Sequence, residues 1–121
     1  MQDSRKYKRF RIHVPVFVSA NGKLIQKRVK LASRDISGGG VSFETSRNIP
    51  LDADSRLVLS DVGDLPEGSV IEGRVVRAEK NPESGRYTVG VEFMKFVNVT
   101  REELLERIEA WEVRAPLEPA D

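Results

Sequence analysis

Cysteine is absent from the 121-residue sequence, and histidine occurs only once, as His13. The lack of cysteine excludes disulfides, thiolate metal sites and a cysteine nucleophile. Aromatic residues make up only 7% of the chain, which leaves few rings on which nucleic-acid bases could stack. No apolar run approaches the roughly 20 residues that a membrane-spanning helix needs. We therefore expect no enzyme, no metal site, no cofactor and no membrane insertion, and we place His13 on the surface.

The charges are almost balanced in number but uneven along the chain. Lysine and arginine total 20 against 19 aspartates and glutamates, which gives a net charge of +1. Residues 1–30 carry +8, residues 31–100 carry −3 and residues 101–121 carry −4. Five bases fall within positions 5–11. Such a cluster attracts phosphate groups on a nucleic acid, a membrane surface or a small ligand, although a solvated chain end would look the same.

The basic N-terminus MQDSRKYKRF is not followed by an apolar segment. It therefore does not match a secretory signal. The lack of cysteine also fits a reducing compartment. We expect a cytoplasmic protein.

Alternating apolar and polar residues predict six short strands. Their approximate bounds are 10–19, 23–32, 41–44, 56–60, 70–79 and 87–93. Pro15 has no N–H to donate, so we expect it at a sheet edge or a bulge. Asn21-Gly22 favours a tight hairpin between the first two strands.

A helix is predicted after the last strand. Thr100 and Glu103 have the spacing of a capping box, and apolar residues then recur at helical spacing up to Trp111, which we assign to the core. Six strands followed by one helix indicate an all-β antiparallel sheet or small barrel with a C-terminal α-helix. We expect a flexible basic arm at residues 1–10, a barrel with its helix at 10–112 and a short tail at 113–121.

The segment Asp35-Ile36-Ser37-Gly38-Gly39-Gly40 is the most informative local feature. Consecutive glycines suit a backbone that bends sharply or approaches a ligand closely. The side chains of Asp35 and Ser37 can accept hydrogen bonds from amide-like N–H groups. The same residues could instead form an Asx or Ser turn with a glycine bulge between two strands. The segment alone does not decide between these two interpretations.

Arg5 and Arg9 form an RxxxR spacing directly before the first predicted strand. A guanidinium is a planar fork of donors that can pair bidentately with phosphate or with the O6/N7 edge of guanine. Two such groups on one stretch of chain could clamp a compact dianion. The spacing alone is weak, because any basic tail contains it by chance.

Together, RxxxR before the first strand and DxSxxG between the second and third strands resemble the PilZ family. The resemblance covers roughly residues 4–112 and includes Val75-Val76-Arg77 and Gly90-Val91-Glu92-Phe93. It implies a six-stranded antiparallel PilZ-type β-barrel that binds the bacterial second messenger cyclic di-GMP.

The family's motif assigns roles to individual residues. Arg5 and Arg9 would hold phosphates and guanine edges, Asp35 and Ser37 would read a guanine, and Gly40 would permit close approach. Secondary candidates around these positions are Lys6, Arg34 and Gly39.

The resemblance implies a receptor that relays cyclic di-GMP binding to an unidentified effector protein. Motility and biofilm formation are candidate processes. We expect no nucleic-acid partner, because the last third of the chain is acidic. The alternatives are a small β-barrel that binds nucleic acid through its basic arm and an interaction module that uses no ligand.

Overall fold

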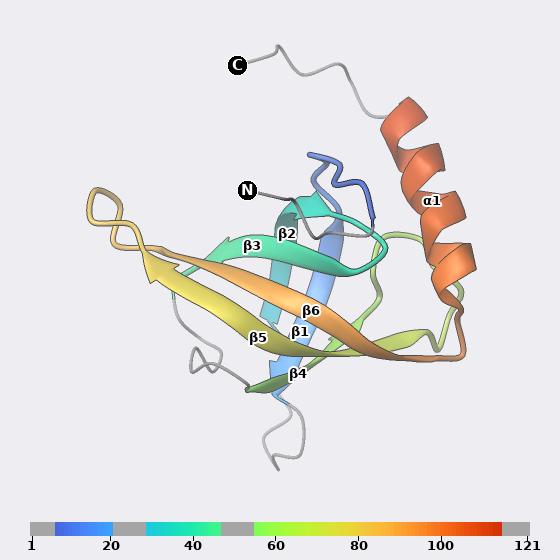
Figure 1. Cartoon of the computed structure of the whole chain (residues 1–121), viewed down its shortest axis with the longest axis horizontal. Coiled ribbons are helices and arrows are strands. Elements are labelled where there is room, and N and C mark those ends of the chain that lie inside the picture. The colour runs from blue at the N-terminus through green and yellow to red at the C-terminus, as the bar shows by residue number, and fades with distance from the viewer. Residues whose placement is uncertain (1–6, 21–28, 47–54, 115–121) are drawn as a thin grey trace.

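The computed structural model describes residues 7–20, 29–46 and 55–114. Its elements are β1 (Pro15–Ala20), β2 (Val29–Ile36), β3 (Gly40–Thr45), β4 (Arg56–Ser60), β5 (Val70–Lys80), β6 (Tyr87–Val97) and α1 (Arg101–Arg114). The strands form a closed barrel in the order β1-β2-β3-β6-β5-β4, and all neighbours are antiparallel. Figure 1 shows α1 beside one end of the barrel, while the long β5–β6 hairpin extends away on the other side. The predicted six-stranded antiparallel barrel with a C-terminal helix is confirmed.

The first strand begins five residues later than predicted, at Pro15. The residues before it still alternate, and Ile12 and Val14 are buried. The hydroxyl of Ser33 replaces part of the ladder there, because it accepts a hydrogen bond from the Val14 N–H at 2.9 Å and donates one to the Ile12 carbonyl at 2.5 Å. The alternation therefore predicted burial correctly, while pairing before Pro15 is limited to an isolated antiparallel bridge between Phe10 and Ile36 and to these bonds with Ser33. Pro15 was expected at an edge or a bulge and is instead the first residue of β1.

The second strand continues to Ile36, beyond the predicted end at residue 32. Asp35 and Ile36 pair with Ser42 and Val41 of β3, so only residues 37–39 connect the two strands. Asp35 is thus a strand residue, in contrast to the loop position that we expected. The register of β2 shifts between Ser33 and Asp35, which makes the intervening residue a bulge. The proposed Asn21-Gly22 hairpin lies outside the described residues.

The ladder between β5 and β6 contains two bulges. One register shift lies between Val75 and Arg77 of β5, and Val76 is the extra residue. The other leaves Met94 as the extra residue of β6, which runs to residue 97 instead of the predicted 93. Val76 and Met94 are also the exposed large hydrophobic residues of the described chain. Both follow a buried residue, so alternation already directs them outward, and the bulges leave the next residues, Arg77 and Lys95, exposed as well.

The helix α1 starts and packs as the sequence predicts. The Thr100 N–H donates to Glu103 Oε1 at 2.8 Å, and the Glu103 N–H donates to Thr100 Oγ1 at 3.0 Å, which completes the capping box. Trp111 is buried, and its Nε1–H donates to Asp64 Oδ1 at 2.8 Å. Gly63, with a φ of +54°, lies under the ring, where a Cβ would come within 2.4 Å of Trp111 Cζ2. These contacts fix α1 to the loop before β5.

No helix within the described ranges has the length and apolar character to cross a membrane.

Candidate ligand-binding site

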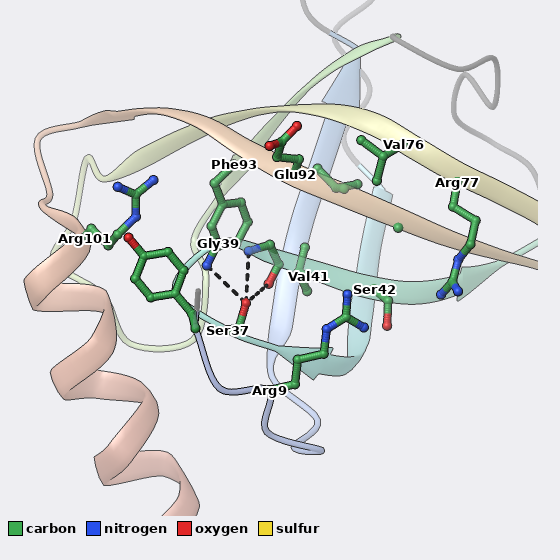
Figure 2. A pocket seen from close by; sticks show the side chains of 14 residues that line it. Arg9, Ser37, Gly39, Val41, Ser42, Val76, Arg77, Glu92, Phe93 and Arg101 are labelled. Atoms are coloured by element: carbon green, nitrogen blue, oxygen red, sulfur yellow. Dashed lines mark hydrogen bonds between the residues drawn. The ribbon is translucent and has the colours of Figure 1, made fainter. Parts of the chain in front are cut away.

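A cavity of about 740 Å³ lies on the outer face of the barrel, where the residues before β1, the β2–β3 turn, β3, β5, β6 and the start of α1 meet. This volume is within the range of about 300–1,000 Å³ that is usual for small-molecule sites. Figure 2 shows the side chains that surround it. The lining residues are Tyr7, Arg9, Ser37, Gly39, Gly40, Val41, Ser42, Val76, Arg77, Gly90, Val91, Glu92, Phe93 and Arg101.

The turn at residues 37–40 forms one wall of the cavity, and internal hydrogen bonds hold its shape. Ser37 Oγ accepts from the N–H groups of Gly39 at 3.1 Å and Gly40 at 3.2 Å (Figure 2). The Ser37 N–H donates to the Gly40 carbonyl at 2.9 Å, and the Phe93 N–H donates to the Gly39 carbonyl at 2.9 Å. The segment therefore adopts the Ser turn that was one of its two interpretations, and the same turn borders the cavity.

Packing inside the protein explains why three glycines stand in this turn. A Cβ on Gly40 would come within 2.4 Å of the backbone carbonyl oxygen of Val91 in β6. A Cβ on Gly39 would lie 3.1 Å from the ring of Tyr7, and one on Gly38 would lie 2.8 Å from Leu105 Cδ2. Gly40 thus permits the close approach of β6, and its neighbours make room for the N-terminal segment and α1.

The structure brings the two sequence motifs together. Arg9 Nη1 lies 3.5 Å from Asp35 Oδ1, and the two side chains are 43% and 25% exposed. Arg9 lines the cavity, whereas Asp35 does not line it and is adjacent to it through Arg9. An ion pair this exposed contributes at most about 1 kcal/mol. A ligand could therefore take over either partner without a large loss of stability.

The remaining residues that the sequence singled out do not line the cavity or lie outside the described residues. Arg5 and Lys6 lie outside the described residues. Arg34 does not line the cavity, because it occupies the β2 bulge and its Nη1 lies 3.7 Å from Glu44 Oε2. His13 is exposed, as expected, and its Nδ1 lies 2.8 Å from the Ser33 carbonyl oxygen.

Arg101 is a cavity residue that the sequence did not reveal. Its Nε–H donates to the Gly38 carbonyl at 2.9 Å. The guanidinium also lies 5.4 Å from the ring centroid of Tyr7 and 4.9 Å from that of Phe96, within cation–π distance. It joins the N-terminal segment, the glycine turn and the first residue of α1. No sequence spacing could have shown this contact, because 63 residues separate the partners.

The lining of the cavity carries an excess of positive charge. Arg9, Arg77 and Arg101 line it together with one acid, Glu92. Glu92 is already paired, because its Oε1 lies 2.7 Å from Arg74 Nη2. Within the described ranges, no three His, Asp or Glu side chains are arranged to hold a metal ion. The arrangement can therefore bind an anion that has flat, hydrogen-bonding groups.

Comparison with known proteins identifies the family of this chain. Residues 3–110 match the model of the PilZ domain. The chain belongs to the PilZ domain family. No curated protein sequence matches this PilZ domain closely enough to count as a relative.

Solved structures with the same fold resemble this PilZ domain at low identity. The Bacillus subtilis inhibitor of motility (MotI/DgrA) superposes with a TM-score of 0.71 and 18% identity, over 95% of this chain and 55% of that one. The K. pneumoniae MrkH–c-di-GMP complex gives a TM-score of 0.59 and 18% identity, over 90% of this chain and 52% of that one. A second MrkH structure, described as a c-di-GMP-dependent transcription regulatory factor, gives a TM-score of 0.60 and 19% identity, over 93% of this chain and 52% of that one. The present chain thus spans about half the length of each.

Proposed function

We propose that this PilZ domain is a receptor for cyclic di-GMP and that the ligand binds in the cavity described above. One observation carries the proposal: Arg9 of RxxxR and the Ser37–Gly40 turn of DxSxxG border the same cavity. The Asp35 carboxylate lies next to this cavity, with Oδ1 3.5 Å from Arg9 Nη1. The two motifs are 26 positions apart in sequence, so only the fold brings them together.

The chemistry of the lining suits this ligand. Cyclic di-GMP carries two phosphodiester charges, and guanidinium groups are well matched to phosphate oxygens. Its guanines also present N–H donors, from which a carboxylate such as Asp35 can accept hydrogen bonds. In this proposal Arg9, with Arg5, holds phosphates and guanine edges, while Asp35 and Ser37 read one guanine. Gly39 and Gly40 keep the cavity wall free of side chains.

The receptor passes the signal to a partner protein by changing the surface that the partner meets. Bound ligand would cover part of the cavity and the Arg9 side chain, which is 43% exposed. A partner responds only if its affinity differs between the free and the bound domain. MotI is an inhibitor of motility, so motility is one process in which this domain could act.

Calorimetric titration of the full chain with cyclic di-GMP tests the proposal. We expect saturable binding by the wild type, and its stoichiometry gives the number of ligands. Arg9→Ala and Asp35→Ala should abolish the heat while the thermal melt barely changes, because their mutual ion pair is exposed. Arg11→Ala is the matched control, since Arg11 is exposed two residues from Arg9 and does not line the cavity.

Two outcomes would contradict the proposal. One is a folded wild type that gives no heat with cyclic di-GMP. The other is steeply salt-dependent binding to oligonucleotides that cyclic di-GMP does not affect, which would identify a nucleic-acid-binding barrel.

A further inference from the structure

Arg9 lies between two residues that are fixed to the rest of the domain. On its C-terminal side, the Phe10 N–H donates to the Ile36 carbonyl and the Ile36 N–H donates to the Phe10 carbonyl, both at 2.9 Å. On its N-terminal side, Tyr7 lines the cavity together with Arg9. Tyr7 is the central residue of the RxxxR motif. Two residues span at most about 7 Å of chain, so the position of Tyr7 limits where Arg5 and Arg9 can lie.

The Tyr7 ring packs on one of the two walls of the cavity. These are the turn wall, residues 37–40, and the β5–β6 wall, residues 76–77 and 90–93. A Cβ on Gly38 would lie 3.0 Å from Tyr7 Cδ1, and one on Gly39 would lie 3.1 Å from Tyr7 Cδ2. The ring therefore lies against bare backbone in the turn wall, and the contact uses ring carbons rather than the hydroxyl.

Arg101 connects this ring to the core. Its guanidinium lies 5.4 Å from the Tyr7 ring centroid and 4.9 Å from that of Phe96, and Phe96 packs edge-to-face on Phe93 of the core at 5.8 Å. Its Nε–H also donates to the Gly38 carbonyl at 2.9 Å. Figure 2 shows this side chain at the end of the cavity next to α1. Arg101 is thus supported by the core and by the turn, and it supports Tyr7 in turn.

We propose that Arg101 is a positioning residue for the ligand, which acts through Tyr7 to hold residues 7–9 on the turn wall before the ligand arrives. This inference rests on the proposed function. A segment that is already held loses less conformational entropy on binding. The apparent affinity also rises with the fraction of molecules in the binding-competent state. In this arrangement Arg9 contacts the ligand, and Arg101 determines where Arg9 lies.

Calorimetric titration of the full chain with cyclic di-GMP, at near-physiological salt, tests whether Arg101 acts through Tyr7. Tyr7→Ala and Arg101→Ala should each weaken the affinity by about threefold or more, as expected when loss of a cation–π contact lowers the competent fraction. Tyr7→Phe should bind as the wild type does, because it keeps the ring. The double variant should stay within about 1.5-fold of Tyr7→Ala, since a contact made through Tyr7 can be lost only once. Arg107→Ala, on the same helix but outside the cavity, is the control and should bind normally.

A second measurement follows the segment without any ligand. Limited trypsin digestion with mass spectrometry gives the rate of cleavage after Lys8, relative to cleavage after Arg74 within β5, which requires the barrel to open. Tyr7→Ala and Arg101→Ala should raise this ratio by about fivefold or more, a larger factor than the loss of affinity, because the released fraction starts small. Tyr7→Phe and Arg107→Ala should leave the ratio unchanged.

The outcomes separate this inference from the proposed function. If the wild type does not bind, the proposed function fails, and the cleavage ratio shows separately whether Arg101 holds the segment. If the wild type binds and Arg101→Ala matches Arg107→Ala in affinity or in cleavage ratio, the positioning role is wrong. If Arg101→Ala weakens binding as much in the Tyr7→Ala background as in the wild type, Arg101 acts on the ligand directly or through overall charge, and the role through Tyr7 is overturned.

Discussion

The two walls of the cavity contain similar residues, but the protein uses them differently. In the turn wall, the Ser37 hydroxyl and the Gly38 and Gly39 carbonyls are all engaged in internal hydrogen bonds. The missing side chain of Gly40 makes room for β6. In the β5–β6 wall, an added Cβ on Gly90 would make only ordinary contacts with the Arg77 and Val76 side chains, at 3.6–3.9 Å. The guanidinium of Arg77, which lines the cavity, has no polar partner within the described ranges.

A sequence motif that is associated with binding can therefore also stabilise the fold. The turn wall is a rigid support whose polar groups are already satisfied, so a substitution there should lower stability. In the β5–β6 wall, Val91 and Phe93 belong to the core, whereas Arg77 is exposed. A substitution of Arg77 or Gly90 should therefore change binding and leave stability unaffected.

The largest contrast is expected between Gly40→Ala and Gly90→Ala in urea denaturation. Gly40→Ala forces a Cβ against the Val91 carbonyl, and backbone in a closed barrel cannot move aside. It should lower the free energy of unfolding by about 3 kcal/mol, the upper part of the range for overpacking. Gly90→Ala fits its site and restricts the unfolded chain, so it should be neutral or gain about 0.4–1 kcal/mol. Equal losses in both variants would remove the distinction between the walls.

A smaller loss is expected for Arg101→Ala. The variant loses the hydrogen bond to the Gly38 carbonyl and the contacts with the Tyr7 and Phe96 rings. Because Arg101 is half-buried, we expect a loss of about 1–2 kcal/mol in the free energy of unfolding, at the lower end for a charged donor. Arg107→Ala is the matched control on the same helix. Its ion pair with Asp64 is exposed and 3.5 Å long, so its removal should cost less than about 1 kcal/mol.

Arg77→Ala is the corresponding arginine variant in the β5–β6 wall. It should shift the unfolding free energy by no more than about 0.5 kcal/mol, as is usual for a surface substitution. A loss as large as that of Arg101→Ala would show that Arg77 supports the fold, and the contrast between the walls would fail.

The fold was predictable because its signals are local. Alternation along each strand and the Thr100–Glu103 capping box depend on neighbouring residues only. The errors arose where a distant group acts. Ser33 takes over the pairing of residues 12–14 from 19 positions away or more, and the bulge at Val76 depends on its register with β6.

The candidate site divides in the same way. Arg9, Ser37 and Gly40 belong to short motifs that can be found in a sequence, and all three line the cavity. Arg77 lies in the segment Val75-Val76-Arg77, which contributed to the family resemblance but received no role in the site, and Arg101 lies in no motif, because its contact spans 63 residues. Sequence reasoning therefore assigned site residues to the wall that is built by a local turn and none to the wall that is built by strand register.

Ser37→Ala, with an expected loss between those of Arg101→Ala and Arg77→Ala, tests the turn wall itself. The variant removes a hydroxyl that accepts two backbone N–H groups in a buried turn, so urea denaturation should show a loss of about 1 kcal/mol. Ser84→Ala is the control, because its hydroxyl accepts one N–H in an exposed turn, and it should lose only a few tenths of that amount. If Ser37→Ala proves as mild as Ser84→Ala, the backbone bonds between Ser37 and Gly40 and between Phe93 and Gly39 hold the turn alone. The Ser37 hydroxyl would then be available to the ligand, and the turn wall would resemble the β5–β6 wall more than its hydrogen bonds indicate.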